Sequence, residues 1–319
     1  MPLSKLQFRP GVVRDITSYS NEGGWYDIDN VRFQKGFPEK IGGWQKKSNQ
    51  SFLGTCRSLH PWVTLSRDQL LGVGTHLKFY VDEGGAFNDI TPLRSTTTAG
   101  DVTFSATDGS SELTVTDTNH GAVQNDFVTF SGATSLGGNI TADVLNQEYQ
   151  ITSVTDANTY TITARSAGTS ISDITEDGQL NPTEVDANSS DTSDGGSAVV
   201  GKYQVNTGLD LNVSGAGWGA GTWGRAGWGE PSDDAIVSNT LRMWSQDNFG
   251  EDLLINVRDG GIYYWDATNG LTSRAVNITD LAGSTSAPQV AKQIMVSDRD
   301  RHVIALGCDA EGDAGNQDP

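Results

Sequence analysis

The sequence predicts an all-β fold in which a partial β-propeller-like scaffold carries an inserted small β-barrel or sandwich domain. Three observations support this prediction. The 319 residues include 38 glycines, and no apolar period of a helix is sustained over three turns. Short apolar runs alternate with turn residues along most of the chain, as they do in antiparallel sheets. A group of short strands joined by tight turns also recurs, which is typical of propeller blades.

Each copy of this repeat is expected to contain three short strands. The expected strands are residues 63–65, 70–73 and 77–81 in the first copy, 242–244, 253–257 and 262–266 in the second, and 293–296 and 302–306 in the third. The third copy stops before its last strand. We therefore expect residues 51–94 and 203–319 to form a propeller-like platform that is incomplete at its C-terminal end, with the remaining blades in a longer protein.

Residues 1–50 are expected to form a separate N-terminal β-rich arm. This segment is dense in glycine next to aromatic residues, and its short strands are separated by Gly or Pro turns. Its aromatic anchors are Trp25, Phe33, Phe37 and Trp44. Large aromatic side chains bury much area against a neighbour. They can serve as core residues or as a contact between subunits, and the sequence leaves both interpretations open.

The middle of the chain differs from both ends in composition and charge. The formal net charge of the whole chain is −19, and residues 1–94, 95–202 and 203–319 contribute +3, −13 and −9. Residues 95–166 show period-two alternation and turns at regular spacing, which predicts an inserted acidic β-domain. Residues 167–202, rich in Ser, Asp, Thr and Gly, are expected to be a linker or extension.

A second glycine-rich region, residues 215–229, repeats Gly-aromatic-Gly at five-residue spacing. Its indoles are Trp218, Trp223 and Trp228. Glycine lets two backbones approach closely. A loop pinned by its own indoles and a contact with a neighbouring subunit are both consistent with this pattern.

The search for catalytic or metal sites gives a negative expectation. His60, His76, His120 and His302 have unrelated sequence contexts, and no nucleophile elbow or phosphate-binding loop is present. The acidic residues Asp309, Glu311, Asp313 and Asp318 depart from a calcium loop, because Ala314 stands where that loop needs glycine. We expect no catalytic residue, cofactor or metal.

The remaining composition limits the function further. Cys56 and Cys308 lack the spacing of metal ligands and are expected to be buried free thiols. No run of about 18 apolar residues predicts a membrane span, and no signal peptide is expected. The acidic surface disfavours nucleic-acid recognition, although DNA could slide past such a wall without sticking to it.

Six further segments stand out together: residues 6–12, 21–27, 30–33, 36–44 and 53–57, together with 296–305. In these segments the sequence resembles the tail structural proteins of short-tailed bacteriophages, and in particular the tail nozzle, or tubular tail hub protein. The resemblance covers residues 3–94 well and residues 215–319 moderately. Members of this family are usually much longer than 319 residues.

This resemblance implies a structural protein of the virion, synthesised in the host cytoplasm, that is not an enzyme. It implies a homo-oligomer, with six copies in a ring around a channel through which the genomic DNA leaves. Its expected partners are an adaptor ring near the portal and tail fibre or needle proteins. The alternatives are a tail module that binds host-surface glycan and, third, a polysaccharide-degrading propeller, which would need converging carboxylates.

Overall fold

The computed structural model describes residues 9–43, 45–46, 48, 50–166, 183–210, 241–284, 286–297 and 299–310. The chain divides into two compact units, Met1–Asn49 and Gln50–Pro319. Strands form almost all of the regular structure, so the prediction of an all-β protein is confirmed. Within the described residues, the one α-helix is α1 (Ala142–Leu145), and no helix there is long and apolar enough to cross a membrane.

The N-terminal unit contains a single β-hairpin. Its strands are β1 (Val31–Gln34) and β2 (Phe37–Lys40), which pair antiparallel. Lys35 and Gly36 form the two-residue turn with φ of 51° and 85°. Positive φ at both central residues matches the twist of a hairpin, and Gly36 adopts it without steric cost.

The repeated units of the second compact unit are three antiparallel sheets. Sheet 1 contains β3 (Cys56–Val63), β4 (Gln69–Thr75), β5 (Phe79–Glu83) and β6 (Ala86–Asp89). Sheet 2 contains β15 (Trp244–Phe249), β16 (Asp252–Val257), β17 (Ile262–Trp265) and β18 (Val276–Asn277). Sheet 3 contains β19 (Gln293–Val296) and β20 (Val303–Leu306).

Sheets 1 and 2 differ from the expectation of three strands, because each has a fourth, short strand. The first strand was also misplaced. It ends at Val63, and residues 64–68 form a turn in which the Thr64 amide donates to the Asp68 carbonyl over 3.0 Å. Leu65, which was expected in the strand, is 89% exposed at this turn. An apolar side chain is therefore not by itself evidence for a buried strand position here.

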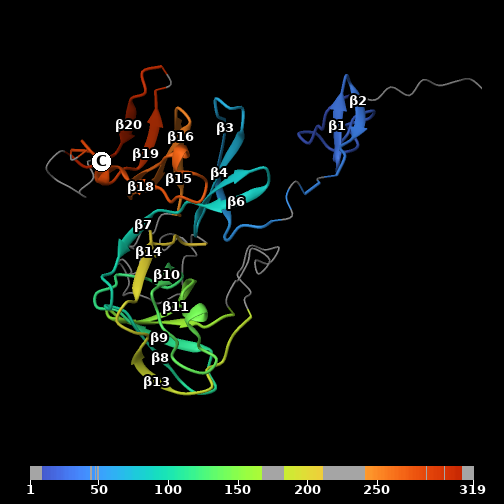
Figure 1. Cartoon of the computed structure of the whole chain (residues 1–319). Coiled ribbons are helices and arrows are strands. Elements are labelled where there is room, and N and C mark those ends of the chain that lie inside the picture. Colours follow the sequence, from blue (N-terminus) through green and yellow to red (C-terminus); the bar gives the residue numbers. More distant parts are fainter. Residues whose placement is uncertain are drawn as a thin grey trace, which may run out of the picture. The chain divides into compact units, whose positions relative to one another are not determined.

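The three sheets stack face to face (Figure 1). Between sheets 1 and 2, the Phe79 and Trp244 rings lie 5.1 Å apart and the Trp62 and Trp265 rings 6.4 Å apart, both in edge-to-face geometry. Between sheets 2 and 3, the Ser245 hydroxyl donates to the Ile294 carbonyl over 2.9 Å. The described part of the chain thus contains a blade-like stack, and neither the stack nor any sheet in it closes into a propeller.

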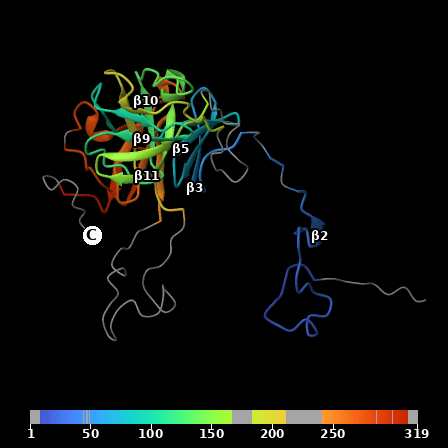
Figure 2. The same ribbon diagram turned by 90° about the horizontal axis from the view of Figure 1, so that it is seen from below.

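The insert is one curled eight-stranded sheet in the order β13-β8-β9-β12-β11-β10-β14-β7. Its strands are β7 (Leu93–Thr96), β8 (Thr103–Ala106), β9 (Glu112–Thr116), β10 (Phe127–Ser131), β11 (Glu148–Asp156), β12 (Thr159–Thr163), β13 (Asp191–Asp194) and β14 (Val200–Gln204). Register shifts in β11 mark bulges, which bend a strand and favour curling. Figure 2 shows β9, β10 and β11 of this sheet from below.

The curled sheet encloses its own core. The Phe104 ring of β8 and the Phe130 ring of β10 lie 4.9 Å apart, although three strands separate them in the sheet order. The first strand, β7, pairs with the last, β14. The chain therefore enters and leaves the insert at neighbouring positions, as an insertion requires.

Part of the expected linker belongs to this sheet. Residues 167–182 lie outside the described residues, but β13 and the first half of β14 fall within residues 183–202. Ala187 and Val199 in this segment are buried in the core of the insert. The polar composition of β13 hid it, because a strand at the edge of a sheet can be polar and still pair through its backbone.

Candidate functional site

The aromatic residues expected at a subunit interface are only partly described. Trp25 and Phe33 are half-buried, and their rings contact each other edge to face at 6.3 Å. Phe37 on β2 is 74% exposed. Trp44, Trp218, Trp223 and Trp228 lie outside the described residues.

The N-terminal unit has little interior of its own. Asn21 is the only buried residue among those described in it. The large exposed apolar side chains include Val12, Ile16, Tyr19 and Phe37. Because these side chains are exposed, they are available to contact other surfaces. A two-stranded hairpin is at best marginally stable alone in water, so such contacts would stabilise it.

A second exposed apolar surface lies on sheet 3. The register pairs Met295 with Ile304 and Gln293 with Leu306, so Met295, Ile304 and Leu306 share one face, turned away from sheet 2. They are 47%, 42% and 48% exposed. We call these three residues the outward face of sheet 3. Sequence reasoning identified the strands but could not show that a neighbour covers only one of their two faces.

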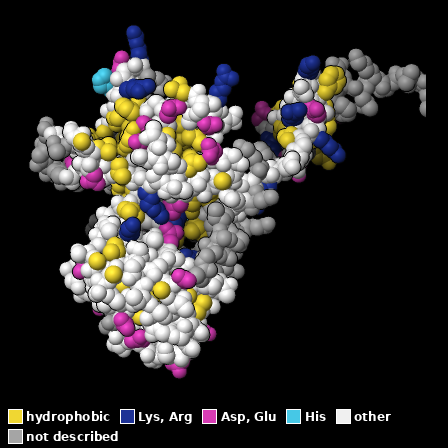
Figure 3. Space-filling view, in the orientation of Figure 1, with side chains coloured by type: hydrophobic (Ala, Val, Ile, Leu, Met, Phe, Trp, Pro, Cys, Tyr) yellow, Lys and Arg dark blue, Asp and Glu magenta, His cyan; other side chains and the backbone are white. Residues whose placement is uncertain are grey.

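Sheet 1 has a similar exposed row at the other end of the stack. Trp62 of β3 is buried against sheet 2, so the alternate residues Leu59 and Val63 point to the opposite face. These two side chains are 60% and 61% exposed. Figure 3 shows apolar side chains gathered over the part of the molecule that contains the stacked sheets.

A group of four charged residues joins the insert to the sheets, and we call it the charged joint. Lys78 Nζ lies 2.7 Å from an Asp89 oxygen and 2.5 Å from a Glu148 oxygen. Arg274 lies 3.4 Å from Asp89 and 3.3 Å from Glu148. Glu148 begins β11 of the insert, whereas the other three residues belong to the stack. Two cations therefore balance two anions across the junction.

Burial makes this joint electrostatically strong. The Lys78 side chain is 2% exposed, and its ammonium lies 4.4 Å from the centre of the Phe127 ring. Burial alone would raise the pKa of Asp89, but Lys78 and Arg274 outweigh it and hold this pKa at about 2. The carboxylate is thus charged at every physiological pH.

A second polar contact reinforces the junction. Asp126, which is fully buried in the insert, accepts from the Thr207 amide over 2.8 Å and from the Asn206 side chain over 2.5 Å. Residues 206 and 207 follow the last strand of the insert. The chain is therefore held by hydrogen bonds where it returns to the stack.

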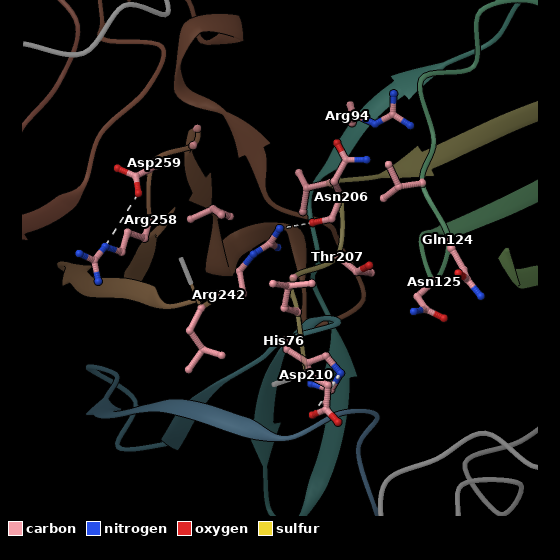
Figure 4. Close-up of a pocket in the computed structure, with 18 of the residues that line it drawn as sticks. His76, Arg94, Gln124, Asn125, Asn206, Thr207, Asp210, Arg242, Arg258 and Asp259 are labelled. Atoms are coloured by element: carbon pink, nitrogen blue, oxygen red, sulfur yellow. Dashed lines mark hydrogen bonds and ion pairs between the residues drawn. The ribbon is translucent and has the colours of Figure 1, made fainter. Parts of the chain in front are cut away.

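A cavity with a volume of about 830 Å³ lies beside this junction (Figure 4). Its walls come from the insert, from residues 205–210 and 241–242, and from the β16–β17 turn. Two contacts lie within its wall: the His76 imidazole is 3.8 Å from the Asp210 carboxylate, and the Arg258 guanidinium is 3.9 Å from the Asp259 carboxylate. Arg242 donates to the Asn206 carbonyl.

Two guanidinium groups in this wall keep unused donors. Arg242 Nη1, and Nε and Nη2 of Arg94, are buried without a hydrogen-bond partner. No carboxylate of the described residues forms an ion pair with either arginine. Burial lowers the pKa of Arg242 to about 10, because removing water from the guanidinium disfavours its charged form. An anionic or strongly polar ligand would reduce that cost.

His76 is the histidine in the wall of this cavity. Burial lowers the pKa of His76, and Asp210 opposes this shift only in part. The His76 Nδ1 atom already accepts from the Thr55 amide over 3.0 Å. Within the described ranges, no group of three or more His, Cys, Asp or Glu could hold a metal ion.

The other residues singled out in the sequence lie apart. Cys56 and Cys308 are free thiols, but both are half-buried rather than buried. Asp309 accepts from the Gln289 and Val290 amides, so its carboxylate stabilises a turn. Glu311, Asp313 and Asp318 lie outside the described residues.

Comparison with known proteins gives only weak similarity. No known family matches the sequence, and no curated protein matches it. Among solved structures, the chain is similar to a phage phi92 endosialidase with 12% sequence identity and a TM-score of 0.20. The match covers 82% of this chain and 35% of the other chain. A similarity at this level assigns neither fold nor activity.

Proposed function

We propose that this chain is a non-enzymatic structural subunit of a short-tailed phage tail, in which copies assemble into a ring as the nozzle or hub. The ring, with six copies, provides the channel for DNA exit. It contacts an adaptor ring on one side and fibre or needle proteins on the other. The resemblance of the N-terminal sequence to this family supplies the identity of the assembly.

The observation that carries the assembly role is the outward face of sheet 3. Met295, Ile304 and Leu306 are apolar and exposed, whereas the equivalent positions in sheet 2 are covered by sheets on both sides. In β16, Leu253 and Ile255 pack toward sheet 1 and Leu254 packs toward sheet 3. Strands that are buried on both faces typically carry apolar residues on both faces. Contiguous exposed apolar surface is typical of protein interaction sites.

The charge distribution agrees with a conduit. The insert region carries a net charge of −13 within the chain's −19. A surface of this sign repels the phosphate backbone, so DNA passes it without adhering. The charged joint fixes the acidic insert on the stack, which favours a defined placement in an assembly.

The test is the oligomeric state of the purified chain. We expect mass photometry and negative-stain electron microscopy to detect rings with a bore of about 20 Å or more, the width of duplex DNA with its two grooves. The double variant Met295→Glu/Ile304→Glu should convert rings to monomers, because it places charge in an apolar contact. Thr118→Glu, on an exposed loop of the insert, is the matched control. A chain that is monomeric at all concentrations contradicts the proposal.

A second candidate function is binding of a host-surface glycan, and the polar cavity favours it. The unpaired donors of Arg94 and Arg242 suit an acidic sugar. Isothermal titration with acidic oligosaccharides should then give an affinity that Arg242→Gln lowers at least about tenfold, the effect expected when a buried charge contact is lost. Arg258→Gln, which removes an arginine already paired with Asp259, should change the affinity less than about threefold. Equal affinities for the two variants would remove this candidate.

A further inference from the structure

The connection between β17 and β18 contains the only Asn-Gly pair in the sequence, Asn269–Gly270. Asn269 is the last residue of the one-turn 3-10 helix η3 (Ala267–Asn269), and Gly270 follows it with a φ of 85°. Both residues are exposed. A Cβ at Gly270 would have no described atom within 4 Å. The peptide bond between the two residues therefore lies in open space at the surface.

Two weak hydrogen bonds hold this pair in place. The Gly270 amide donates to the Ala267 carbonyl over 3.1 Å, and Asn269 Nδ2 donates to the Asp266 carboxylate over 3.2 Å. Both distances lie at the long end of the range for N–H···O bonds. A single 3-10 turn has poor hydrogen-bond geometry, so it opens readily. Opening releases the Gly270 nitrogen and the Asn269 side chain together.

We infer that Asn269–Gly270 is a modification site at which the chain deamidates itself. The Gly270 backbone nitrogen gives its proton to hydroxide and attacks Asn269 Cγ. The Cγ–Nδ2 bond then breaks, and Nδ2 takes a proton from water and leaves as ammonia. The product is a five-membered succinimide. Water opens this ring at either carbonyl and leaves aspartate or isoaspartate, so the net reaction consumes one water and releases one ammonia.

The contrast with the other asparagines explains why this one is selected. Every other asparagine is followed by a residue that has a side chain. Asn158 is exposed in the turn between β11 and β12, but Thr159 follows it, and a β-branched side chain crowds the adjacent backbone nitrogen. Asn256 is fully buried, and its Nδ2 atom donates to the Val257 carbonyl over 2.9 Å. Only Asn269 combines exposure with an unhindered nitrogen.

The modification changes the charge next to η3. The Asp266 carboxylate accepts from the Thr268 amide over 2.8 Å and so caps this turn. Deamidation removes the hydrogen bond that Asn269 Nδ2 donates to Asp266 and places a second carboxylate beside it. Like charges three residues apart destabilise a helical turn. The reaction therefore loosens η3, whose Ala267 packs against the core shared by sheets 1 and 2. This inference does not rest on ring formation.

The test uses the folded full chain, incubated at mildly alkaline pH and at about 37 °C, since asparagine is a thermolabile residue. Trypsin then releases residues 259–274, in which Asn269 is the only asparagine. We expect mass spectrometry to show that this peptide exchanges an NH group for an oxygen. Chromatography should separate two products, with more isoaspartate than aspartate. Asn158 in the same digest is the internal control and should react at least about tenfold more slowly.

Two variants test the two reacting groups. Gly270→Ala adds a methyl group beside the attacking nitrogen and should slow the reaction at least about tenfold. Because alanine is strained at the positive φ of Gly270, circular dichroism checks that this variant is folded. Asn269→Gln keeps the backbone unchanged and should prevent the reaction on the same timescale, because a six-membered ring closes more slowly. The rate in the parent chain should rise with pH, because the attacking nitrogen must first lose its proton.

Three results would overturn the inference. One is an unmodified peptide 259–274 from the folded chain under conditions in which the urea-unfolded chain reacts, because the fold then protects the pair. Another is aspartate as the sole product, which indicates direct hydrolysis without the ring. The third is an equal rate at Asn269 and Asn158, because Gly270 then has no effect.

Discussion

The insert and the stacked sheets solve the problem of burying apolar surface in opposite ways. The insert curls one sheet around a core of 21 buried apolar residues, which include Phe104, Phe130 and Tyr160. The stack buries its apolar residues between neighbouring sheets, and its end sheets expose Leu59, Val63 and the outward face of sheet 3. The insert is therefore self-sufficient, whereas the stack depends on what lies next to it.

The two regions also differ in how charge is used. In the insert, acidic residues lie mainly on the surface, where a net negative charge keeps proteins apart. At the charged joint, Lys78 is buried, Asp89, Glu148 and Arg274 are partly buried, and the four charges balance one another. The contrast between a self-sufficient insert and a neighbour-dependent stack can be tested in four ways.

The largest effect is expected for Phe104→Ala in the insert. Phe104 is fully buried and contacts Phe130 edge to face, and removal of a buried phenyl ring costs about 4 kcal/mol of unfolding free energy. Urea unfolding followed by circular dichroism measures it. Because the insert has its own core, ring assembly of the surviving folded protein should persist. Joint loss of insert and ring would show that the two regions are not independent.

The next effect is expected at the charged joint. Lys78→Met leaves two partly buried carboxylates with one cation and should cost about 3 kcal/mol. The double variant Lys78→Met/Glu148→Gln keeps the Arg274–Asp89 pair balanced and should recover part of that loss. A double-mutant cycle on thermal unfolding gives the coupling. Additive losses would mean that Lys78 and Glu148 do not act on each other.

Acid provides a third test at the same place. The pKa of Asp89 is about 2 in the folded chain and 3.8 ordinarily. A carboxylate with a lowered pKa stabilises the fold above its ordinary pKa, and this contribution disappears as the pH falls from about 4 to about 2. The shift corresponds to about 2 kcal/mol. The stability difference between the parent chain and Asp89→Asn should therefore shrink over this range. A constant difference would contradict the assignment.

The smallest effect is expected for Val63→Ser on sheet 1. This apolar side chain is 61% exposed, so its loss should change the unfolding free energy of the single chain by less than about 0.5 kcal/mol. Chemical denaturation of dilute protein measures this value. A loss as large as that of a core residue would show that a part of the same chain covers Val63.

Much of the strand pattern could be predicted from the sequence. The period-two alternation within residues 95–166 predicted strands there, and β9 and β12 lie in this range, because such alternation indicates one buried face. The start of β19 at Gln293 was likewise expected. The fourth strands β6 and β18 were missed, since short edge strands need few apolar residues.

The sites were harder to predict than the strands. The charged joint brings together Lys78, Asp89, Glu148 and Arg274, which are distant in sequence and have no motif. A buried lysine carries no sequence signal, and only its partners across the insert boundary account for it. The polar cavity also depends on that boundary, because Arg94 and Arg242 approach it from opposite sides of the insert in the sequence. The aromatic residues of the N-terminal unit, by contrast, were easy to identify. Their exposure could not be predicted, because it depends on which other segments pack against them.

The pairing of β7 with β14 has an evolutionary consequence. Because the two ends of the insert meet in one ladder, a gene segment encoding it can be gained, lost or exchanged as a single cassette while the reading frame of the stack continues. The charged joint restricts such exchange, since a new cassette must bring its own carboxylate to Lys78 and Arg274. Lineages that carry a different insert are therefore expected to change one of these two basic residues together with it.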